Sequence, residues 1–137
     1  MRILGIDYGD SRTGFAVSDP LGFGAGTLPA CKDKNMRKVA DYAAALAKEK
    51  DVGLIILGFP KNMNGSIGPR GEKTQIFAGM LEERLDIPVK LWDERLTTVS
   101  AHILMNETNV RGQKRKDSVD SISAAFLLQS YLDSTRI

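Results

Sequence analysis

The run of residues from Val52 to Leu57 constrains the fold of this chain more than any other segment. It is continuously apolar between the polar Asp51 and the turn-forming Gly58-Phe59-Pro60, which is typical of a strand that is buried on both faces. Apolar residues recur at helical spacing on either side of it, over residues 36–47 and 69–85. Strands that alternate with helices join into parallel sheets through right-handed crossovers. The sequence therefore predicts an α/β fold in which this strand lies at the sheet centre.

The two helical segments carry recognisable start signals. Asn35 is expected to cap the first helix, since its side chain can accept a hydrogen bond from a backbone N–H of the first turn. Pro69 suits the first position of the second helix, where a missing N–H costs nothing. The residues of the second helix that are expected to point inward are Ile76, Phe77, Met80, Leu81 and Leu85.

The opening segment predicts antiparallel strands. Residues 2–8 are expected to form a largely apolar strand, and Gly9-Asp10-Ser11 supplies the turn for a hairpin into a second strand over residues 13–18. A third short strand is expected to begin at Leu28, because the following Pro29 suits the edge of a sheet. Antiparallel hairpins next to parallel crossovers predict a mixed sheet.

The later segments complete one domain over residues 1–137. A strand is expected over residues 89–93, a short helix from Thr97 or Thr98 to about Asn106, and a last helix from Ser118 to Leu132. The fold class is therefore α/β, with a mixed five-stranded sheet and helices on both faces.

Composition excludes several classes of protein. With 42% hydrophobic and 26% charged residues in 137, the chain is expected to be globular rather than disordered or collagen-like. The single cysteine, Cys31, cannot form an internal disulfide, and no signal peptide or membrane-length apolar run is visible, so a cytoplasmic protein is expected. The formal net charge of +2 does not by itself indicate a nucleic-acid partner.

Carboxylates stand at the ends of two predicted strands. Asp7 ends the apolar first strand, and Asp93 and Glu94 stand at the end of the strand that begins at Val89. Ligands of α/β sheets bind outside the carboxyl ends of parallel strands, so these acids are candidates for a functional site. The alternatives are a turn-starting aspartate at Asp7 and a solvated strand end at the other two.

A third acid is expected on the last helix. Asp120 lies on the apolar stripe that includes Ala124 and Leu127, so it should face the sheet. Alternatively, Asp117 and Asp120 only stabilise the start of that helix. Converging carboxylates are the ligands that Mg²⁺ or Mn²⁺ requires, and two such ions about 4 Å apart can cleave a phosphodiester.

Basic residues gather in one stretch, Arg111 to Lys116. Its cations could hold a nucleic-acid backbone beside the metal ions, although such loops are more often only solvated surface. The cations in question are Arg111, Lys114, Arg115 and Lys116. His102, the single histidine, is a weaker candidate for proton transfer, and an ordinary surface position is its alternative.

Several motifs together resemble one family, the YqgF group of RuvC-like, ribonuclease-H-fold proteins, whose members are described as Holliday junction resolvases or pre-16S rRNA nucleases. The resemblance spans nearly the whole chain. The motifs that carry it are Gly5-Ile6-Asp7-Tyr8-Gly9, Arg12-Thr13-Gly14, Ala16-Val17-Ser18-Asp19, Gly58-Phe59-Pro60, Asn62-Met63-Asn64-Gly65, Gly68-Pro69-Arg70, Trp92-Asp93-Glu94-Arg95-Leu96-Thr97-Thr98, and Asp120 with Ala124 and Leu128-Gln129-Ser130-Tyr131-Leu132.

The resemblance implies a metal-dependent nuclease with catalytic, metal-binding acids at Asp7, Glu94 and Asp120, using Mg²⁺ or Mn²⁺, with two ions expected. Arg12 and Arg95, which lie within the motifs, are expected to contact nucleic acid with the basic stretch. The implied reaction is 5′-end processing of precursor 16S rRNA, with Holliday junction resolution as the alternative, by a monomer or weak homodimer. The chain departs from the family pattern at positions 121 and 123, where serine replaces the more usual lysine and alanine.

Two other classes compete with a nuclease. Actin-like and sugar-kinase ATPases also open with a strand ending in Asp-x-Gly, here Asp7-Tyr8-Gly9, but they resemble two such domains and this chain has residues for one. A non-catalytic RNA-binding factor for ribosome assembly would retain the acids without cleaving. Metal-dependent cleavage distinguishes these classes.

Overall fold

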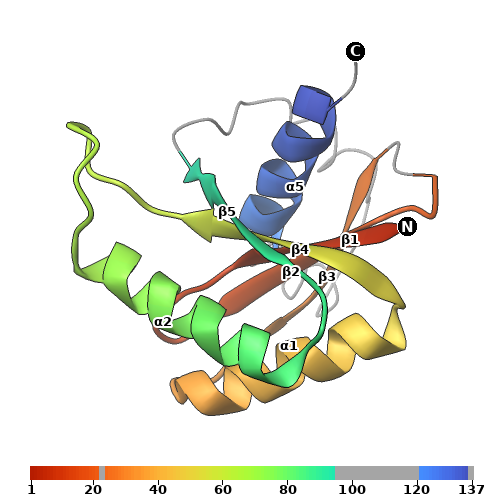
Figure 1. Cartoon of the computed structure of the whole chain (residues 1–137), viewed down its shortest axis with the longest axis horizontal. Helices are drawn as coiled ribbons and strands as arrows, with labels where there is room; N and C mark the ends of the chain where they lie inside the picture. Colours follow the sequence, from red (N-terminus) through yellow and green to blue (C-terminus); the bar gives the residue numbers. More distant parts are fainter. Residues whose placement is uncertain (22–23, 95–120, 136–137) are drawn as a thin grey trace, which may run out of the picture.

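The computed structural model describes residues 1–21, 24–94 and 121–135, and in it the chain forms one mixed sheet with helices on both faces (Figure 1). The strands follow the order β3-β2-β1-β4-β5 across the sheet. Their bounds are β1 Arg2–Asp7, β2 Thr13–Ser18, β3 Ala25–Cys31, β4 Val52–Phe59 and β5 Val89–Asp93. The helices are α1 Met36–Glu49, α2 Pro69–Arg84 and α5 Ile122–Thr135. The predicted fold class is confirmed.

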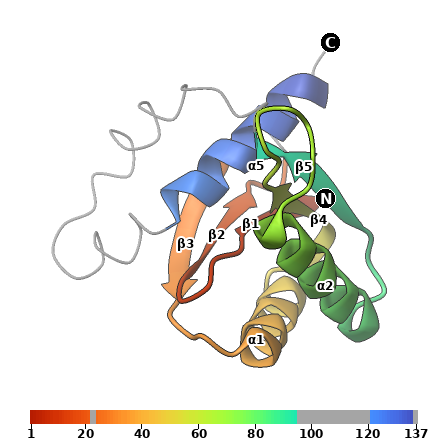
Figure 2. The ribbon, with the colours of Figure 1, turned by 90° about the vertical axis from the view of Figure 1, so that its left-hand side faces the viewer.

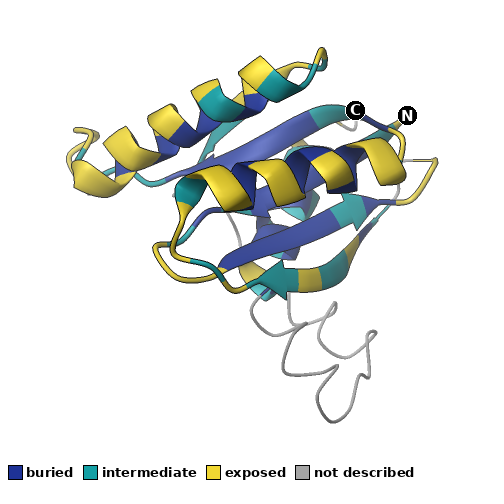
Figure 3. Ribbon diagram, turned by 90° about the horizontal axis from the view of Figure 1, so that it is seen from below, coloured by how far each residue is buried: buried dark blue, intermediate teal, exposed yellow. Residues whose placement is uncertain are grey.

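The sheet separates two hydrophobic clusters. Helices α1 and α2 cover one face and α5 covers the other, as the turned view shows (Figure 2). Along β1, Leu4 and Ile6 are buried on the side of α1 and α2, whereas Ile3 is buried on the side of α5. The alternation of a strand thus supplies both clusters. Figure 3 shows the exposed residues of α1 on the side away from the sheet.

Strand direction gathers several strand ends at one edge. Strand β1 pairs in parallel with β4, and β4 pairs in parallel with β5, so the carboxyl ends of these three strands lie together. Phe59 at the end of β4 stands opposite Asp93 at the end of β5. Asp7 ends β1 on the other side of β4. The edge that the sequence indicated for ligands is therefore the edge that carries the acids.

Helix α5 packs directly on the backbone of β1. A Cβ atom at Gly5 would lie 2.9 Å from the Leu128 Cβ and 3.0 Å from the Ala124 carbonyl oxygen. Such contacts are too short for any other residue at this position. Gly5 therefore sets how closely α5 approaches the sheet.

A buried serine holds the start of α5 against β2 and β3. The Ser121 hydroxyl accepts a hydrogen bond of 3.0 Å from the Phe15 N–H and donates one to the Leu28 carbonyl. The side chain is completely buried, and the pairing of β2 with β3 shifts register next to it, between Thr13 and Phe15. Ser121 thus satisfies backbone groups of two strands at an irregular point of the ladder.

Three details differ from the sequence-based expectations. Strand β3 begins at Ala25 rather than Leu28, because its ladder with β2 extends to the pair Ser18 and Ala25. Helix α5 ends at Thr135 rather than Leu132. Ile76 is 55% exposed instead of inward, since the buried residues of α2 follow a neighbouring stripe. That stripe consists of Gly71, Thr74, Phe77, Ala78 and Leu81.

Other expectations are confirmed or lie outside the described part. Asn35 caps α1, its side chain accepting a hydrogen bond of 3.2 Å from the Lys38 N–H. Pro69 stands in the first turn of α2, and Pro29 lies on the edge strand β3. The predicted short helix over residues 97–106 and the predicted helix start at residues 118–120 lie outside the described residues. In the described ranges, each helix is too short or too polar to cross a membrane.

We expect Ser121→Ala to lower the free energy of unfolding by about 1–3 kcal/mol, because two buried backbone groups lose their partner. Ser123→Ala, two residues along and exposed, is the matched control and should change it by no more than about 0.5 kcal/mol. Urea denaturation monitored by circular dichroism measures both. Equal values for the two variants would show that the Ser121 hydroxyl does not stabilise the sheet.

Candidate active site

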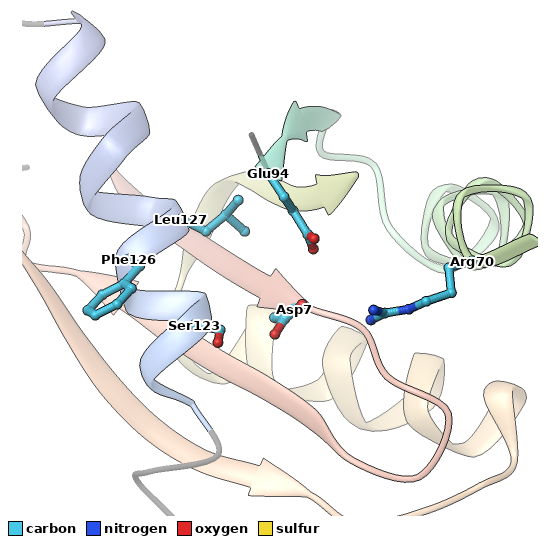
Figure 4. Close-up of a pocket in the computed structure, with 6 residues that line it drawn as sticks. All are labelled: Asp7, Arg70, Glu94, Ser123, Phe126 and Leu127. Carbon is cyan, nitrogen blue, oxygen red and sulfur yellow. The ribbon is translucent and has the colours of Figure 1, made fainter. Parts of the chain in front are cut away.

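A cavity of about 320 Å³ opens at the carboxyl edge of the sheet (Figure 4). Its walls come from the end of β1, the residue that follows β5, the first turn of α2 and the first turns of α5. The residues that line it are Asp7, Arg70, Glu94, Ser123, Phe126 and Leu127. Acidic, basic, hydroxyl and apolar side chains from distant parts of the chain thus surround one space.

Asp7 and Glu94 share a hydrogen bond at this cavity. Burial raises the pKa of the Asp7 carboxyl above its usual range, while the hydrogen bond with Glu94 and the charge of Arg70 act in the opposite direction. Burial, followed by the charge of Asp7, raises the pKa of Glu94 to about 7. The two carboxyls therefore retain a proton between them near neutral pH, because two adjacent negative charges repel each other.

A glycine of β4 makes room for Glu94. A Cβ atom at Gly58 would lie 2.9 Å from the Glu94 Oε1 and 3.3 Å from the Leu127 Cδ2. A larger residue would therefore displace the carboxylate or the α5 side chain beside it. The glycine of the Gly58-Phe59-Pro60 motif is therefore needed to leave space for the Glu94 side chain.

The donor set suits a hard divalent cation. Two carboxyl groups that repel each other present only oxygen atoms, which are the ligands of Mg²⁺ and Mn²⁺. A divalent ion can replace the shared proton and remove the repulsion. Within the part of the chain that the structure describes, no third carboxylate, histidine or cysteine completes a metal-binding group.

The predicted site residues divide into two sets. The structure brings Asp7 and Glu94 together, whereas Asp93 is not among the residues that line the cavity. Arg12 is exposed on the β1–β2 loop and does not line the cavity either. The predicted residues that lie outside the described ranges are Arg95, His102, Arg111, Lys114, Arg115, Lys116, Asp117 and Asp120. Their roles stay predictions.

Sequence reasoning missed Arg70. The motif Gly68-Pro69-Arg70 contributed to the family resemblance, but no role was assigned to the arginine. The signal was present, because a helix that follows a parallel strand starts at the same edge where that strand ends. Figure 4 shows the Arg70 side chain extending from α2 toward Asp7. Ser123, noted only as a departure from the family pattern, also lines the cavity.

The β1–β2 loop is tied to α2 beside the cavity. Lys73 forms an ion pair of 3.1 Å with Asp10, and both side chains are exposed. Gly9 lies so close to the Arg12 carbonyl that a Cβ atom at position 9 would overlap it. The turn predicted at residues 9–11 therefore needs its glycine for close backbone approach.

Comparison with known proteins identifies relatives over nearly the whole chain. Residues 1–134 match the family RuvX, described as Holliday junction resolvase. A protein of Clostridium novyi (strain NT), named "Putative pre-16S rRNA nuclease", is 49% identical over 98% of this chain and 99% of its own length. A protein of Listeria monocytogenes serotype 4b (strain F2365) with the same name is 44% identical over 98% of this chain and 99% of its own length.

Solved structures share the fold at low identity. RuvC of Thermus thermophilus is 12% identical, with a TM-score of 0.64, and the match covers 98% of this chain and 96% of that one. The Holliday junction resolvase of fowlpox virus is 17% identical, with a TM-score of 0.59, over 98% of this chain and 99% of that one. These likenesses show a common RuvC-like, ribonuclease-H-like fold.

The raised pKa of Glu94 predicts how the stability of the metal-free protein depends on pH. Between pH 4.5 and about 7, the unfolded chain ionises Glu94 while the folded protein keeps it protonated. The free energy of unfolding should therefore fall by roughly 1–3 kcal/mol as pH rises through this window.

Denaturation in a metal chelator at several pH values measures this decrease. Glu94→Gln should reduce it, whereas Glu83→Gln, which changes an exposed carboxylate of α2, should leave it as in wild type. If the free energy of unfolding falls with pH as much in Glu94→Gln as in the wild type, Glu94 is not the group responsible.

Proposed function

This chain belongs to the RuvX family, and we propose that it hydrolyses phosphodiester bonds in the 5′-end processing of precursor 16S rRNA. The chain is a nuclease, and a divalent metal takes part in the mechanism of RuvC-like nucleases. The observation that supports the site of this chemistry is the meeting of Asp7 and Glu94 in one cavity with Arg70. We assign the metal to these two carboxylates and to Asp120.

The residues of the cavity fit this reaction. A divalent ion, when bound, activates a water molecule and polarises the phosphate; two Mg²⁺ or Mn²⁺ ions are proposed. Asp7 and Glu94 would hold the ions through their carboxylate oxygens. Phe126 and Leu127 form the apolar side of the cavity. Ser123 can donate a hydrogen bond to a phosphate oxygen.

Identity with relatives favours RNA as the substrate. The relatives named for pre-16S rRNA are 44–49% identical over nearly their whole length, whereas the fowlpox virus structure that contains Holliday junction DNA is 15% identical. Junction resolution is the second candidate, because the family description names it. It requires two active sites and hence a dimer, whereas we propose a monomer or weak homodimer.

The nucleic acid needs contacts beyond the cavity. We propose that Arg12, Arg95 and the basic stretch 111–116 bind phosphates of the backbone on either side of the cleaved bond. Such contacts position a substrate without reading its sequence. The basic stretch is assigned on its charge, and Arg12 and Arg95 on their charge and on the motifs that contain them.

We expect Asp7→Asn to lower the cleavage rate at least about 100-fold while the protein stays folded, because the change removes a ligand charge without changing side-chain volume. Asp41→Asn makes the same change at an exposed site on α1 and should keep wild-type activity. The assay uses Mg²⁺ or Mn²⁺ with a 5′-extended 16S precursor and, separately, a four-way DNA junction. Cleavage of neither substrate by the wild type would contradict the proposal and favour a non-catalytic assembly factor.

The pair Asp120→Asn and Asp117→Asn tests the third ligand. If Asp120 binds metal, its variant should lose cleavage and most of the increase in melting temperature that Mg²⁺ gives the wild type. If Asp117 stabilises only the helix start, its loss should cost about 1 kcal/mol and leave cleavage intact. Normal cleavage and a normal Mg²⁺ response in Asp120→Asn would remove Asp120 from the site.

A further inference from the structure

Arg70 is the one cation among the described residues that line the cavity. Its charge acts on both Asp7 and Glu94, yet the structure shows no direct ion pair between its guanidinium and either described carboxylate. Direct pairs do form elsewhere on the same helix, from Lys73 to Asp10 at 3.1 Å and from Arg84 to Asp41 at 2.7 Å. Arg70 therefore lies near both acids without a direct ion pair to either of them, and its charge lowers the pKa of both carboxyls.

The backbone that carries Arg70 is fixed. Its carbonyl accepts a hydrogen bond of 2.9 Å from the Thr74 hydroxyl one turn along α2. A Cβ atom at Gly71 would lie 2.7 Å from the Ile67 Cγ2 and 3.0 Å from the Pro60 carbonyl oxygen, so the first turn of α2 packs closely on the segment after β4. The guanidinium therefore extends toward the acids from a rigid start point.

The charge of Arg70 indicates which kind of ligand it binds. A fixed positive charge beside a cation site weakens binding of the cation, since like charges repel. The arrangement becomes favourable when an anion enters the same space, because the anion then neutralises the arginine and the metal together. The planar guanidinium matches two oxygens of a phosphate, which a lysine ammonium does not.

We propose that Arg70 is a catalytic residue of this nuclease that binds the non-bridging oxygens of the phosphate being cleaved, from the side of the cavity opposite α5. The inference rests on the proposed function, because it concerns the same phosphodiester. Water adds to phosphorus, the bond from phosphorus to one bridging oxygen breaks, and that oxygen leaves with a proton. The products are a phosphate monoester end and a hydroxyl end. Arg70 transfers no proton and stabilises the negative charge that builds on the non-bridging oxygens.

The variants Arg70→Gln and Arg70→Lys test this role on the full chain. Removing a donor of this kind costs about 100-fold to 1,000-fold in rate, so kcat of Arg70→Gln should fall by that factor. Arg70→Lys should recover part of the rate, because it keeps the charge but loses the paired geometry. Arg84→Gln removes an arginine from the last turn of the same helix and should stay within about 3-fold of wild type.

Metal affinity separates catalysis from positioning. Calorimetry at about pH 8.5, above the Glu94 pKa of about 7, should give Arg70→Gln an affinity for Mn²⁺ equal to or higher than that of the wild type, because both acids are then ionised and a repelling charge is removed. Weaker Mn²⁺ binding would mean that Arg70 only positions the acids, and would overturn the proposal. Wild-type kcat in a folded Arg70→Gln protein would overturn it as well, without affecting the proposed function.

A neutral phosphate analogue tests the contact itself. Once the wild-type cleavage position is mapped, a methylphosphonate is placed there, and binding is measured with Ca²⁺ in place of Mg²⁺. The neutral group should weaken substrate binding by the wild type and by Arg84→Gln. In Arg70→Gln the loss of affinity should be at least about 5-fold smaller than in the wild type. Equal losses in all three proteins would overturn the contact. Absence of any wild-type cleavage would instead contradict the proposed function.

Discussion

The close packing of α5 against the sheet is the constraint on which the rest of the structure depends. Gly5 on β1 and Gly58 on β4 lack the side chains that would hold α5 away, and contacts of 2.9–3.3 Å would arise if either carried a Cβ atom. Because α5 lies so near, Leu127 reaches the carboxyl edge of the sheet and forms a wall of the cavity. At Gly58 the same missing atom leaves space for the Glu94 carboxylate. Gly5 and Gly58 therefore set the distance between α5 and the sheet, and Gly58 also sets the position of the Glu94 carboxylate.

The charges of the cavity follow from that geometry. Asp7 ends β1 and Glu94 follows β5, the two strands on either side of β4, so the strand order brings both acids to one edge of the sheet. Without a cation they share a proton, whereas a divalent cation satisfies both. Arg70 enters from a third direction, on a helix that begins where β4 ends. The fold thus gathers opposite charges from elements that no local sequence pattern connects.

Much of this could be predicted from the sequence, and the remainder depended on long-range contacts. The apolar run at Val52 to Leu57 and the capping residue Asn35 indicate their elements through local chemistry alone. Asp7 was identified because an acid at the end of an apolar strand is unusual, and Glu94 because of the resemblance. The start of β3 was misplaced, since pairing with β2 and not propensity sets it. The position of Arg70 beside the acids was missed, because it depends on the crossover that starts α2 at the edge where β4 ends.

The Ser121 hydroxyl joins α5 to residues that precede it by 106 and 93 positions. During synthesis from the amino terminus, β1 to β5 and their two covering helices leave the ribosome well before this serine does. A nascent chain at that stage can pair its strands, but the face that α5 covers still exposes Ile3, Ala16 and Ile56 to solvent. The cavity also lacks one of its walls. Order of synthesis therefore delays the assembly of the cleavage centre until almost the whole domain is available, so that a partly made nuclease has no competent site.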